Sequence, residues 1–255
     1  MELKEKIAIV TGGASGLGEA CVRRFVLEGA SVGILDVDED NGRRLVAELG
    51  EKVIFCRTDV TGEESVQAAV DRAVAEFGGI HVVINCAGVG TPAKVLGKNG
   101  PMALEHFNRV LQINLTGTMN VIRLAAARIV ENTPNADGEK GVVINTASAA
   151  AFDGQIGQAA YSASKGGVVG MMLPLAREFA QFGIRVNTIA PGIFKTPMIA
   201  GMPEEVQDSI GKQVPFPPRL GAPEEYADTA AFIYGNPMVN GETIRVDGAI
   251  RMQPK

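Results

Sequence analysis

Short apolar runs recur along the chain and alternate with segments of helical periodicity. Most of the runs are almost continuously apolar, which is typical of strands covered on both faces of a parallel sheet. Segments such as 18–29, 63–78, 104–130 and 159–182 place apolar residues at the spacing of amphipathic helices. This alternation predicts an α/β fold with a doubly wound, seven-stranded parallel sheet and helices on both faces. The expected strands are 6–11, 30–36, 52–58, 80–86, 141–147, 184–190 and 242–248.

No linker rich in proline, glycine or serine divides the chain, and no repeat of fixed period is visible. We therefore expect one domain that spans residues 1–255. Two long loop-like stretches, 88–104 and 191–223, each follow the carboxyl end of an expected strand. Open α/β sheets bind ligands at that edge, and loops longer than about 12 residues are uncommon unless they are functional. Both stretches are the expected walls of a substrate site.

Composition narrows the class of partner. The net charge is -5 and 21% of the residues are charged, so no broad basic surface is expected for nucleic acid or anionic lipid. No apolar stretch reaches the roughly 20 residues that cross a bilayer, and the first apolar run begins close to Met1. We expect a soluble cytoplasmic protein without a cleaved leader, or a protein of the mitochondrial matrix if its source is eukaryotic.

The cysteines and histidines do not have the spacing of metal ligands. Cys21, Cys56 and Cys86 are widely spaced inside apolar segments, which favours free, buried thiols in a reducing compartment. The two histidines, His81 and His106, form no ligand pattern. We expect structural or surface roles for both histidines and no bound metal.

A glycine-rich segment, Thr11-Gly-Gly-Ala-Ser-Gly-Leu-Gly18, joins the first expected strand to the first helix. Glycine lets the backbone turn tightly and approach a diphosphate, while free amides and the helix dipole favour negative charge. Glycines also make ordinary turns, so the position between strand and helix carries the prediction of a nucleotide site. The candidate contacts are Gly12, Ser15, Gly16, Leu17 and Gly18.

Asp36 ends the second expected strand, close to where a carboxylate binds the adenosine ribose of a dinucleotide. The alternative is an aspartate that only caps the following turn, as Asp38 could do. A carboxylate here would repel the 2'-phosphate of NADP, and Ser15 and Val37 supply no cation to attract it. The expected cofactor is therefore NAD.

Two further segments follow expected strands at the same edge of the sheet. Small side chains after the fourth strand would let the adenine and ribose lie against the backbone. The aspartate after the third strand has an alternative role, as the cap of a helix that begins near Thr61. The candidate cofactor contacts in these segments are Asp59, Val60, Cys86, Ala87 and Gly88.

Tyr161 and Lys165 stand at i and i+4, so they share one face of a helix. Ser148, just past the fifth strand, and Asn114, inside a long apolar helix, are expected at the same end of the sheet. A carbonyl/alcohol interconversion would use all four. Tyr161 would move a proton, with its charged form stabilised by Lys165 and the ring of NAD⁺. Ser148 would hold the substrate oxygen, and Asn114 a water that leads to solvent.

Taken singly, each of these four residues has an ordinary structural alternative: a half-buried tyrosine, a solvated helix lysine, a turn serine. Their joint occurrence downstream of the nucleotide motif favours the catalytic interpretation. The ordered set also resembles the classical short-chain dehydrogenase/reductase family, a group with the Rossmann fold. The resemblance is carried by TGGASGLG, NCAG (85–88), Asn114, Ser148, YSASK (161–165) and Pro191-Gly192.

The family resemblance implies further contacts. It places Phe194 and Thr196 beside the nicotinamide and gives Tyr161, Lys165, Pro191 and Gly192 a share of cofactor binding. The chain departs from the usual NNAG at Cys86, where the family uses a backbone contact. A bend is expected at Pro174, which removes a backbone hydrogen bond within the catalytic helix.

Segments 141–167, 213–221 and 240–254 resemble the 3-hydroxyacyl-CoA dehydrogenases of this family. That resemblance implies NAD-linked oxidation of short or branched 3-hydroxyacyl-CoA substrates, with steroids or other secondary alcohols as alternatives, and a homotetramer. Lys94 and Lys98 in the loop 88–104 are candidates for the CoA phosphates, unless they are simply solvated.

Two other functions stay open at this stage. An NADPH-dependent 3-oxoacyl-[acyl-carrier-protein] reductase would share the same four residues, although Asp36 argues against NADPH. A non-catalytic NAD-binding scaffold would have no need for the intact set. The cofactor preference and the turnover of the protein separate the three.

Overall fold

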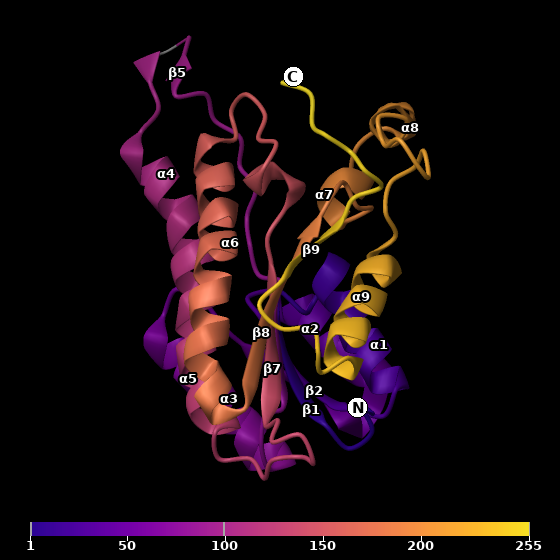
Figure 1. Ribbon diagram of the computed structural model, residues 1–255. Coiled ribbons are helices and arrows are strands. Elements are labelled where there is room, and N and C mark those ends of the chain that lie inside the picture. Colours follow the sequence, from indigo (N-terminus) through magenta and orange to yellow (C-terminus); the bar gives the residue numbers. More distant parts are fainter. Residues whose placement is uncertain (1, 99, 255) are drawn as a thin grey trace.

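A seven-stranded parallel sheet forms the centre of the protein, in the order β3-β2-β1-β4-β7-β8-β9 (Figure 1). The computed structural model describes residues 2–98 and 100–254. Each neighbouring pair of strands is parallel, and the predicted doubly wound α/β fold is confirmed. The strands are β1 Ile7–Thr11, β2 Ser31–Asp36, β3 Val53–Arg57, β4 Val82–Asn85, β7 Gly141–Thr146, β8 Ile184–Pro191 and β9 Thr243–Val246.

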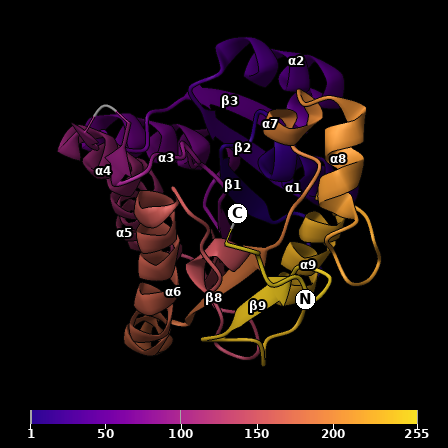
Figure 2. The ribbon, with the colours of Figure 1, turned by 90° about the horizontal axis from the view of Figure 1, so that it is seen from above.

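Helices cover both faces of the sheet. Successive residues of a strand point to opposite sides, and here both sets are apolar, so each face is buried under helices. In β1, Ala8 and Val10 belong to one buried cluster and Ile9 to the other. Figure 2 shows α3, α5 and α6 on one side of the sheet and α1 and α9 on the other. The helices are α1 Gly16–Leu27, α2 Glu39–Leu49, α3 Glu63–Phe77, α4 Leu104–Leu111, α5 Gly117–Ile129, α6 Ala159–Phe179, α7 Pro197–Ala200, α8 Glu204–Gly211 and α9 Pro223–Gly235.

The expectation of loops over 88–104 and 191–223 is wrong in part. The first stretch holds a short antiparallel hairpin, and the second holds α7 and α8. Pro197 begins α7, where its fixed φ suits a first helical residue, and acidic residues of the first turn favour the start of α8. A proline therefore starts a helix inside a stretch expected to be a loop. The hairpin strands are β5 Leu96–Gly97 and β6 Gly100–Pro101.

The helix expected over 104–130 is divided by a π-helical segment, Gln112–Thr116, between α4 and α5. Such segments are frequent at functional sites. Pro174 lies inside α6, and the helix continues through it to Phe179. Within the described part of the chain, no helix is long and apolar enough to cross a membrane.

A buried ion pair joins the amino end of β8 to the segment before β7. Arg185 Nη2 lies 3.0 Å from Glu139 Oε1, and the two side chains are only 7% and 8% exposed. The guanidinium also donates to the backbone oxygens of Ile233 and Tyr234 at the end of α9 and of Val239 in the loop that follows it. One arginine thus holds three segments that are distant in sequence.

We expect Glu139→Gln to lower the free energy of unfolding by about 3 kcal/mol, because it leaves the charge of Arg185 buried without a counter-ion. The matched control is Glu131→Gln, whose carboxylate pairs with Arg128 at a 60% exposed position and should contribute less than about 1 kcal/mol. Denaturant unfolding of both variants measures the difference. Equal losses in the two variants would contradict the special weight of the buried pair.

Candidate active site

The glycine-rich segment folds into a tight turn between β1 and α1. Gly12 and Gly16 have φ values of 62° and 55°, which side-chain-bearing residues rarely adopt. A Cβ at Gly12 would lie 2.8 Å from the backbone nitrogen of Ala87, and one at Gly18 only 2.1 Å from the oxygen of Gly12. Ser15 is the N-cap of α1, and its side chain makes no capping hydrogen bond. The turn therefore presents backbone and a helix N-terminus, as an anionic ligand requires.

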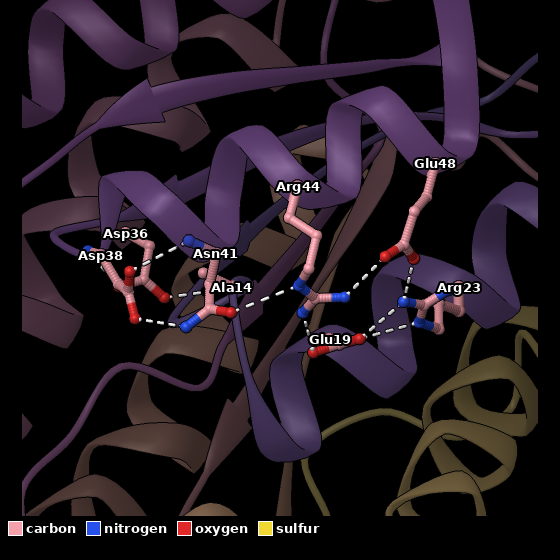
Figure 3. A network of polar contacts seen from close by, with 8 residues as sticks. All are labelled: Ala14, Glu19, Arg23, Asp36, Asp38, Asn41, Arg44 and Glu48. Atoms are coloured by element: carbon pink, nitrogen blue, oxygen red, sulfur yellow. Dashed lines mark hydrogen bonds and ion pairs between the residues drawn. The ribbon is translucent and has the colours of Figure 1, made fainter.

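Asp36 is tied to this turn. Its Oδ2 accepts a hydrogen bond from the amide of Ala14 at 3.0 Å, and its Oδ1 accepts from the amide of Asp38 at 3.0 Å. Asp38, not Asp36, caps α2 by accepting from the amide of Asn41 (Figure 3). Asp36 thus has a structural role in the turn after β2, and it also stands beside the glycine-rich segment. The second position is the one that a ribose-binding carboxylate needs.

The polar contacts of Asp38 and Asn41 continue along α1 and α2. Figure 3 shows Arg44 bonded to Asn41, to Glu19 and to Glu48. Arg23 then joins the same two glutamates. These half-exposed ion pairs hold α2 against the helix that begins at the glycine-rich turn.

The end of β4 passes directly under the turn. The amide of Ala87 donates to Thr11 Oγ1 at 3.1 Å, and that of Cys86 to the Thr11 oxygen at 3.1 Å. A Cβ on Gly88 would lie 3.2 Å from Asn114 Oδ1 and 3.5 Å from Lys165 Nζ. Gly88 therefore lies between the glycine-rich turn and the polar side chains of Asn114 and Lys165.

Asp59 does not cap a helix near Thr61, so that alternative is wrong. The helix α3 begins at Glu63 with Gly62 as its N-cap. Asp59 instead accepts from the amide and the hydroxyl of Thr61, and these bonds lower the pKa of its carboxyl. Val60 is buried, and its backbone oxygen accepts from Asn120.

Asn114 is fully buried in the π-helical segment. Its Oδ1 accepts from the amide of Val89 at 2.8 Å, and its Nδ2 donates to the Val89 oxygen at 2.9 Å and to Ser164 Oγ at 3.0 Å. Ser164 Oγ in turn donates to the backbone carbonyl oxygen of Tyr161. The side chain thus joins the loop after β4 to α6, the helix that holds Tyr161 and Lys165. A role for Asn114 in holding water stays a prediction.

Lys165 lies below Tyr161 on α6. Its Nζ donates to the Thr146 oxygen at 2.7 Å and stands 5.8 Å from the centroid of the Tyr161 ring. The lysine is only 4% exposed, and this burial lowers the pKa of its ammonium to about 8. Because this pKa lies close to neutral pH, a bound ligand can change the charge of the amine.

Ser148 follows β7 and faces Tyr161. Its Oγ accepts from the amide of Ala150 as the cap of the short 3₁₀ helix Ala149–Ala151, which leaves the hydroxyl hydrogen for another partner. Burial raises the pKa of Tyr161, while a hydrogen bond with Ser148 lowers it. In the protein alone burial has the larger effect, so the phenolate needs additional positive charge.

Three residues that contact the candidate site, Thr146, Tyr226 and Val89, belong to no motif in the sequence. Thr146 supplies the carbonyl for Lys165, and its hydroxyl shares a hydrogen bond with the buried Tyr226 at 2.7 Å. Val89 holds Asn114. Thr146 could have been noticed by its place just before Ser148, but Tyr226 comes from α9 and reaches the site only in the folded chain.

The turn after β8 meets the glycine-rich segment. The amide of Gly192 donates to the Val246 oxygen at 2.9 Å, and a Cβ on Gly192 would lie 2.8 Å from Asp247 Cα. Thr196 caps α7, and its side chain would lie 3.6 Å from a Cβ on Gly16. Phe194 is buried in the core cluster and packs on Gly221. The start of the stretch 191–223 therefore closes one side of the nucleotide site.

The histidines make backbone contacts, and only one of the three cysteines is fully buried as expected. His81 Nδ1 accepts from the amide of Ile7, and His106 Nε2 bonds the Thr91 oxygen. Cys21 is buried, whereas Cys56 and Cys86 are half-buried, and all three are free thiols. Among residues 2–98 and 100–254, no group of three His, Cys, Asp or Glu side chains is arranged to hold a metal ion.

The chain belongs to the short-chain dehydrogenase family: the family model described as short chain dehydrogenase matches residues 6–207. The enzymes most informative for comparison are type-2 3-hydroxyacyl-CoA dehydrogenases. The protein so named from Drosophila melanogaster is 53% identical over 254 residues, which cover 99% of this chain and 100% of that protein. The one from Homo sapiens is 52% identical, with 99% and 97% covered.

Solved structures agree with this family. The crystal structure of 3-hydroxyacyl-CoA dehydrogenase type-2 from Mycobacterium avium is 42% identical, covers 100% of both chains and has a TM-score of 0.95. That of 3-ketoacyl-(acyl-carrier-protein) reductase from Brucella melitensis, complexed with NADH, is 29% identical, covers 98% and 100%, and has a TM-score of 0.87. The resemblance drawn from the sequence motifs is confirmed.

We expect Ser148→Ala to raise the pKa of Tyr161, because it removes the hydrogen bond that favours the phenolate. The phenolate absorbance of the protein without nucleotide is titrated in both forms. Tyr161→Phe isolates the contribution of Tyr161 from the other two tyrosines. A Tyr161 titration that stays unchanged, or moves to lower pH, would show that Ser148 does not act on the phenol.

Proposed function

We propose that the protein is an NAD-dependent oxidoreductase that interconverts 3-hydroxyacyl-CoA and 3-oxoacyl-CoA of short or branched chain. The observation that carries the proposal is the meeting of Ser148, Tyr161 and Lys165 beside Gly88, at the edge that holds the glycine-rich turn. The type-2 3-hydroxyacyl-CoA dehydrogenases, about half identical over the whole chain, support the substrate.

The residues at the nucleotide end fit NAD. A Cβ at Gly12 or Gly18 would collide with backbone, so the turn keeps the open shape that a diphosphate needs. Asp36 supports NAD over NADP, since its carboxylate would repel a 2'-phosphate. Bound NAD⁺ would supply the acceptor for a hydride from the carbinol carbon of the substrate. The residues proposed to hold it are Gly12, Ser15, Gly16, Leu17, Gly18, Asp36, Asp59, Val60, Cys86, Ala87, Gly88, Tyr161, Lys165, Pro191, Gly192, Phe194 and Thr196.

The proton moves through the protein's own side chains. Ser148 Oγ accepts from the amide of Ala150, so its hydroxyl hydrogen, which is directed to Tyr161 in the protein alone, is proposed to turn to the substrate oxygen when substrate binds. Tyr161, as phenolate, takes the proton of the substrate hydroxyl, and in the reverse direction the phenol returns it to the carbonyl oxygen. Lys165 keeps a positive charge beneath the ring, and this charge offsets the effect of burial on the pKa of Tyr161. Asn114 is proposed to hold a water on the way to solvent.

The charge of Lys165 gives the site a pH limit. Because burial lowers the pKa of the ammonium to about 8, its charged fraction falls as the pH rises through that value. Bound substrate and nucleotide change the surroundings of the amine, so this value belongs to the protein alone. Loss of the charge would weaken stabilisation of the phenolate.

The acyl-CoA is proposed to enter between the stretches 88–104 and 191–223. Lys94 and Lys98 are both exposed on the first stretch, where they are candidates for the CoA phosphates. An acyl-carrier-protein thioester is the alternative substrate, and the similarity to the reductase of Brucella melitensis is the observation that supports it. Steroids and other secondary alcohols are a further alternative.

A homotetramer is proposed for the assembled protein. Large apolar side chains are exposed on α6 and α9, among them Leu173 (40%) and Phe232 (53%), and Phe182 just after α6 is also exposed (44%). Such surfaces usually meet a partner. Sedimentation of the purified protein as a monomer would exclude this. The free thiols support a reducing compartment, either the cytoplasm or, for a eukaryotic source, the mitochondrial matrix.

Tyr161→Phe should lower kcat by about 10²- to 10⁴-fold, the usual contribution of a positioned acid or base, and leave NADH affinity within about twofold. Initial rates of NADH formation and fluorescence titration with NADH measure the two effects. Tyr234→Phe is the matched control, because the Tyr234 hydroxyl bonds the Glu2 oxygen outside the site. A near-normal rate in Tyr161→Phe would remove the tyrosine from the mechanism.

We expect Asp36→Asn to reduce the preference for NAD over NADP by about tenfold or more, equivalent to roughly 1.4 kcal/mol, since the repulsive charge is lost. Asp38→Asn removes a neighbouring carboxylate that caps α2 and should leave the preference unchanged.

Both cofactors are assayed side by side with 3-hydroxyacyl-CoA, acyl-carrier-protein and steroid substrates. Preference of the wild type for NADPH and the carrier protein would favour the reductase. Tight NADH binding without turnover of any substrate would favour the scaffold.

A further inference from the structure

Arg245, on the edge strand β9, binds two carboxylates from different segments. Its Nε donates to Asp247 Oδ2 at 2.6 Å and its Nη2 to Asp153 Oδ2 at 2.7 Å. The guanidinium also stacks on Phe152, 5.1 Å from the ring centroid. In the register of the sheet, Arg245 pairs with Ala190, the residue before the Pro191 turn. The side chain is 22% exposed, so these contacts are shielded in part from water.

Asp247 belongs to the nicotinamide side of the proposed site. It follows Val246, which pairs with Pro191 and accepts the amide of Gly192. Asp247 Cα and Cβ would both lie 2.8 Å from a Cβ on Gly192. The Asp247 side chain is only 7% exposed and also accepts from the amide of Ala249. Asp247 therefore has a fixed position against the turn at Gly192.

Asp153 belongs to the segment that connects Ser148 with Tyr161. Its amide donates to the Ala149 oxygen at 2.9 Å, inside the short helix that Ser148 caps. The next residue, Gly154, packs closely on the first turn of α6: a Cβ added at this position would lie 2.3 Å from Ser162 Oγ. A shift of Asp153 would thus reach both Ser148 and the turn that carries Tyr161.

The C-terminal segment reinforces the same connection. Arg245 Nη2 donates to the Ile250 oxygen at 3.1 Å, the amide of Ile156 donates to the Pro254 oxygen at 3.0 Å, and Gln155 Nε2 donates to the Gln253 oxygen at 3.0 Å. Figure 1 shows this segment rising from β9 toward the loops at the carboxyl edge of the sheet. It is bonded to residues 155 and 156 of the segment between Ser148 and Tyr161.

We propose that Arg245 is a positioning residue for the reaction proposed above: by binding Asp153 and Asp247 together, it fixes Ser148 and Tyr161 relative to the turn at Gly192. A planar guanidinium can bind two carboxylates in fixed directions and stack on a ring at the same time, which the point charge of lysine cannot do. Errors near 1 Å at a reacting centre can cost about 10²-fold in rate, so a brace between the two sides of the site has a measurable effect.

The test compares Arg245→Met, Arg245→Lys, Asp153→Asn and the double variant Arg245→Met/Asp153→Asn. We expect Arg245→Met to lower kcat by about 10- to 100-fold with NADH affinity within about twofold, and Arg245→Lys to recover only part of the rate. If Arg245 acts through Asp153, the two single effects are not additive, so the double variant resembles Arg245→Met. The control is Arg128→Met on α5, which also removes an arginine between two acids, Asp71 on α3 and Glu131 just after α5.

A general loss of stability is distinguished from positioning by two readouts. A merely structural role would lower the unfolding midpoint of Arg245→Met below that of Arg128→Met and leave kcat per folded molecule unchanged. Such a result, or additive effects of Arg245→Met and Asp153→Asn on kcat, overturns the proposal.

Amide exchange separates this proposal from the proposed function. In Arg245→Met we expect faster hydrogen exchange over residues 153–160, measured by mass spectrometry, and unchanged exchange in β1 and α1. If the wild type turns over no substrate, the proposed function fails, and the exchange still decides whether Arg245 holds the segment. Unchanged exchange over 153–160 removes the brace, whatever the activity.

Discussion

The parallel direction of all seven strands is the constraint on which the site depends. Because parallel strands share one carboxyl edge, the residues that follow them emerge together, although the chain returns through a helix each time. Thr11, Asp36, Gly88, Ser148 and Pro191 follow or end five strands of this sheet in this way. β1 lies between β2 and β4, so the strand order reverses at the glycine-rich turn, which is where open α/β sheets bind their ligands.

The proposed reacting groups, Tyr161 and Lys165, lie in an environment that disfavours their charged forms. Burial lowers the pKa of Lys165 and raises that of Tyr161, so both charged forms are destabilised in the protein alone. The local backbone is adapted to hold such groups: the π-helical segment directs Asn114 to Val89, and the Thr146 carbonyl receives the ammonium. A bound positive ring would favour the phenolate, which couples proton transfer to occupancy of the nucleotide site.

Two arginines act at opposite ends of β8 with different consequences. Arg185 at the amino end is buried with Glu139 and three backbone oxygens, and its loss is expected mainly in stability. Arg245 pairs with the carboxyl end of the same strand, where its partners lie on segments that carry reacting groups. The same ion-pair chemistry therefore serves the fold at one edge and the proposed reaction at the other.

The sequence by itself determined the strands, the glycine-rich turn and the order of the motifs, because these depend on local periodicity and on residue types with narrow uses, such as glycine at positive φ. It also pointed to Asn114, Ser148, Tyr161 and Lys165, whose spacing is local or tied to strand ends. It did not show the helices inside 191–223, where prolines begin elements as readily as they break them. Only the tertiary structure brought Tyr226 to Thr146 and Arg245 to Asp153, because contacts between residues so distant in sequence depend on how helices and loops pack around the sheet.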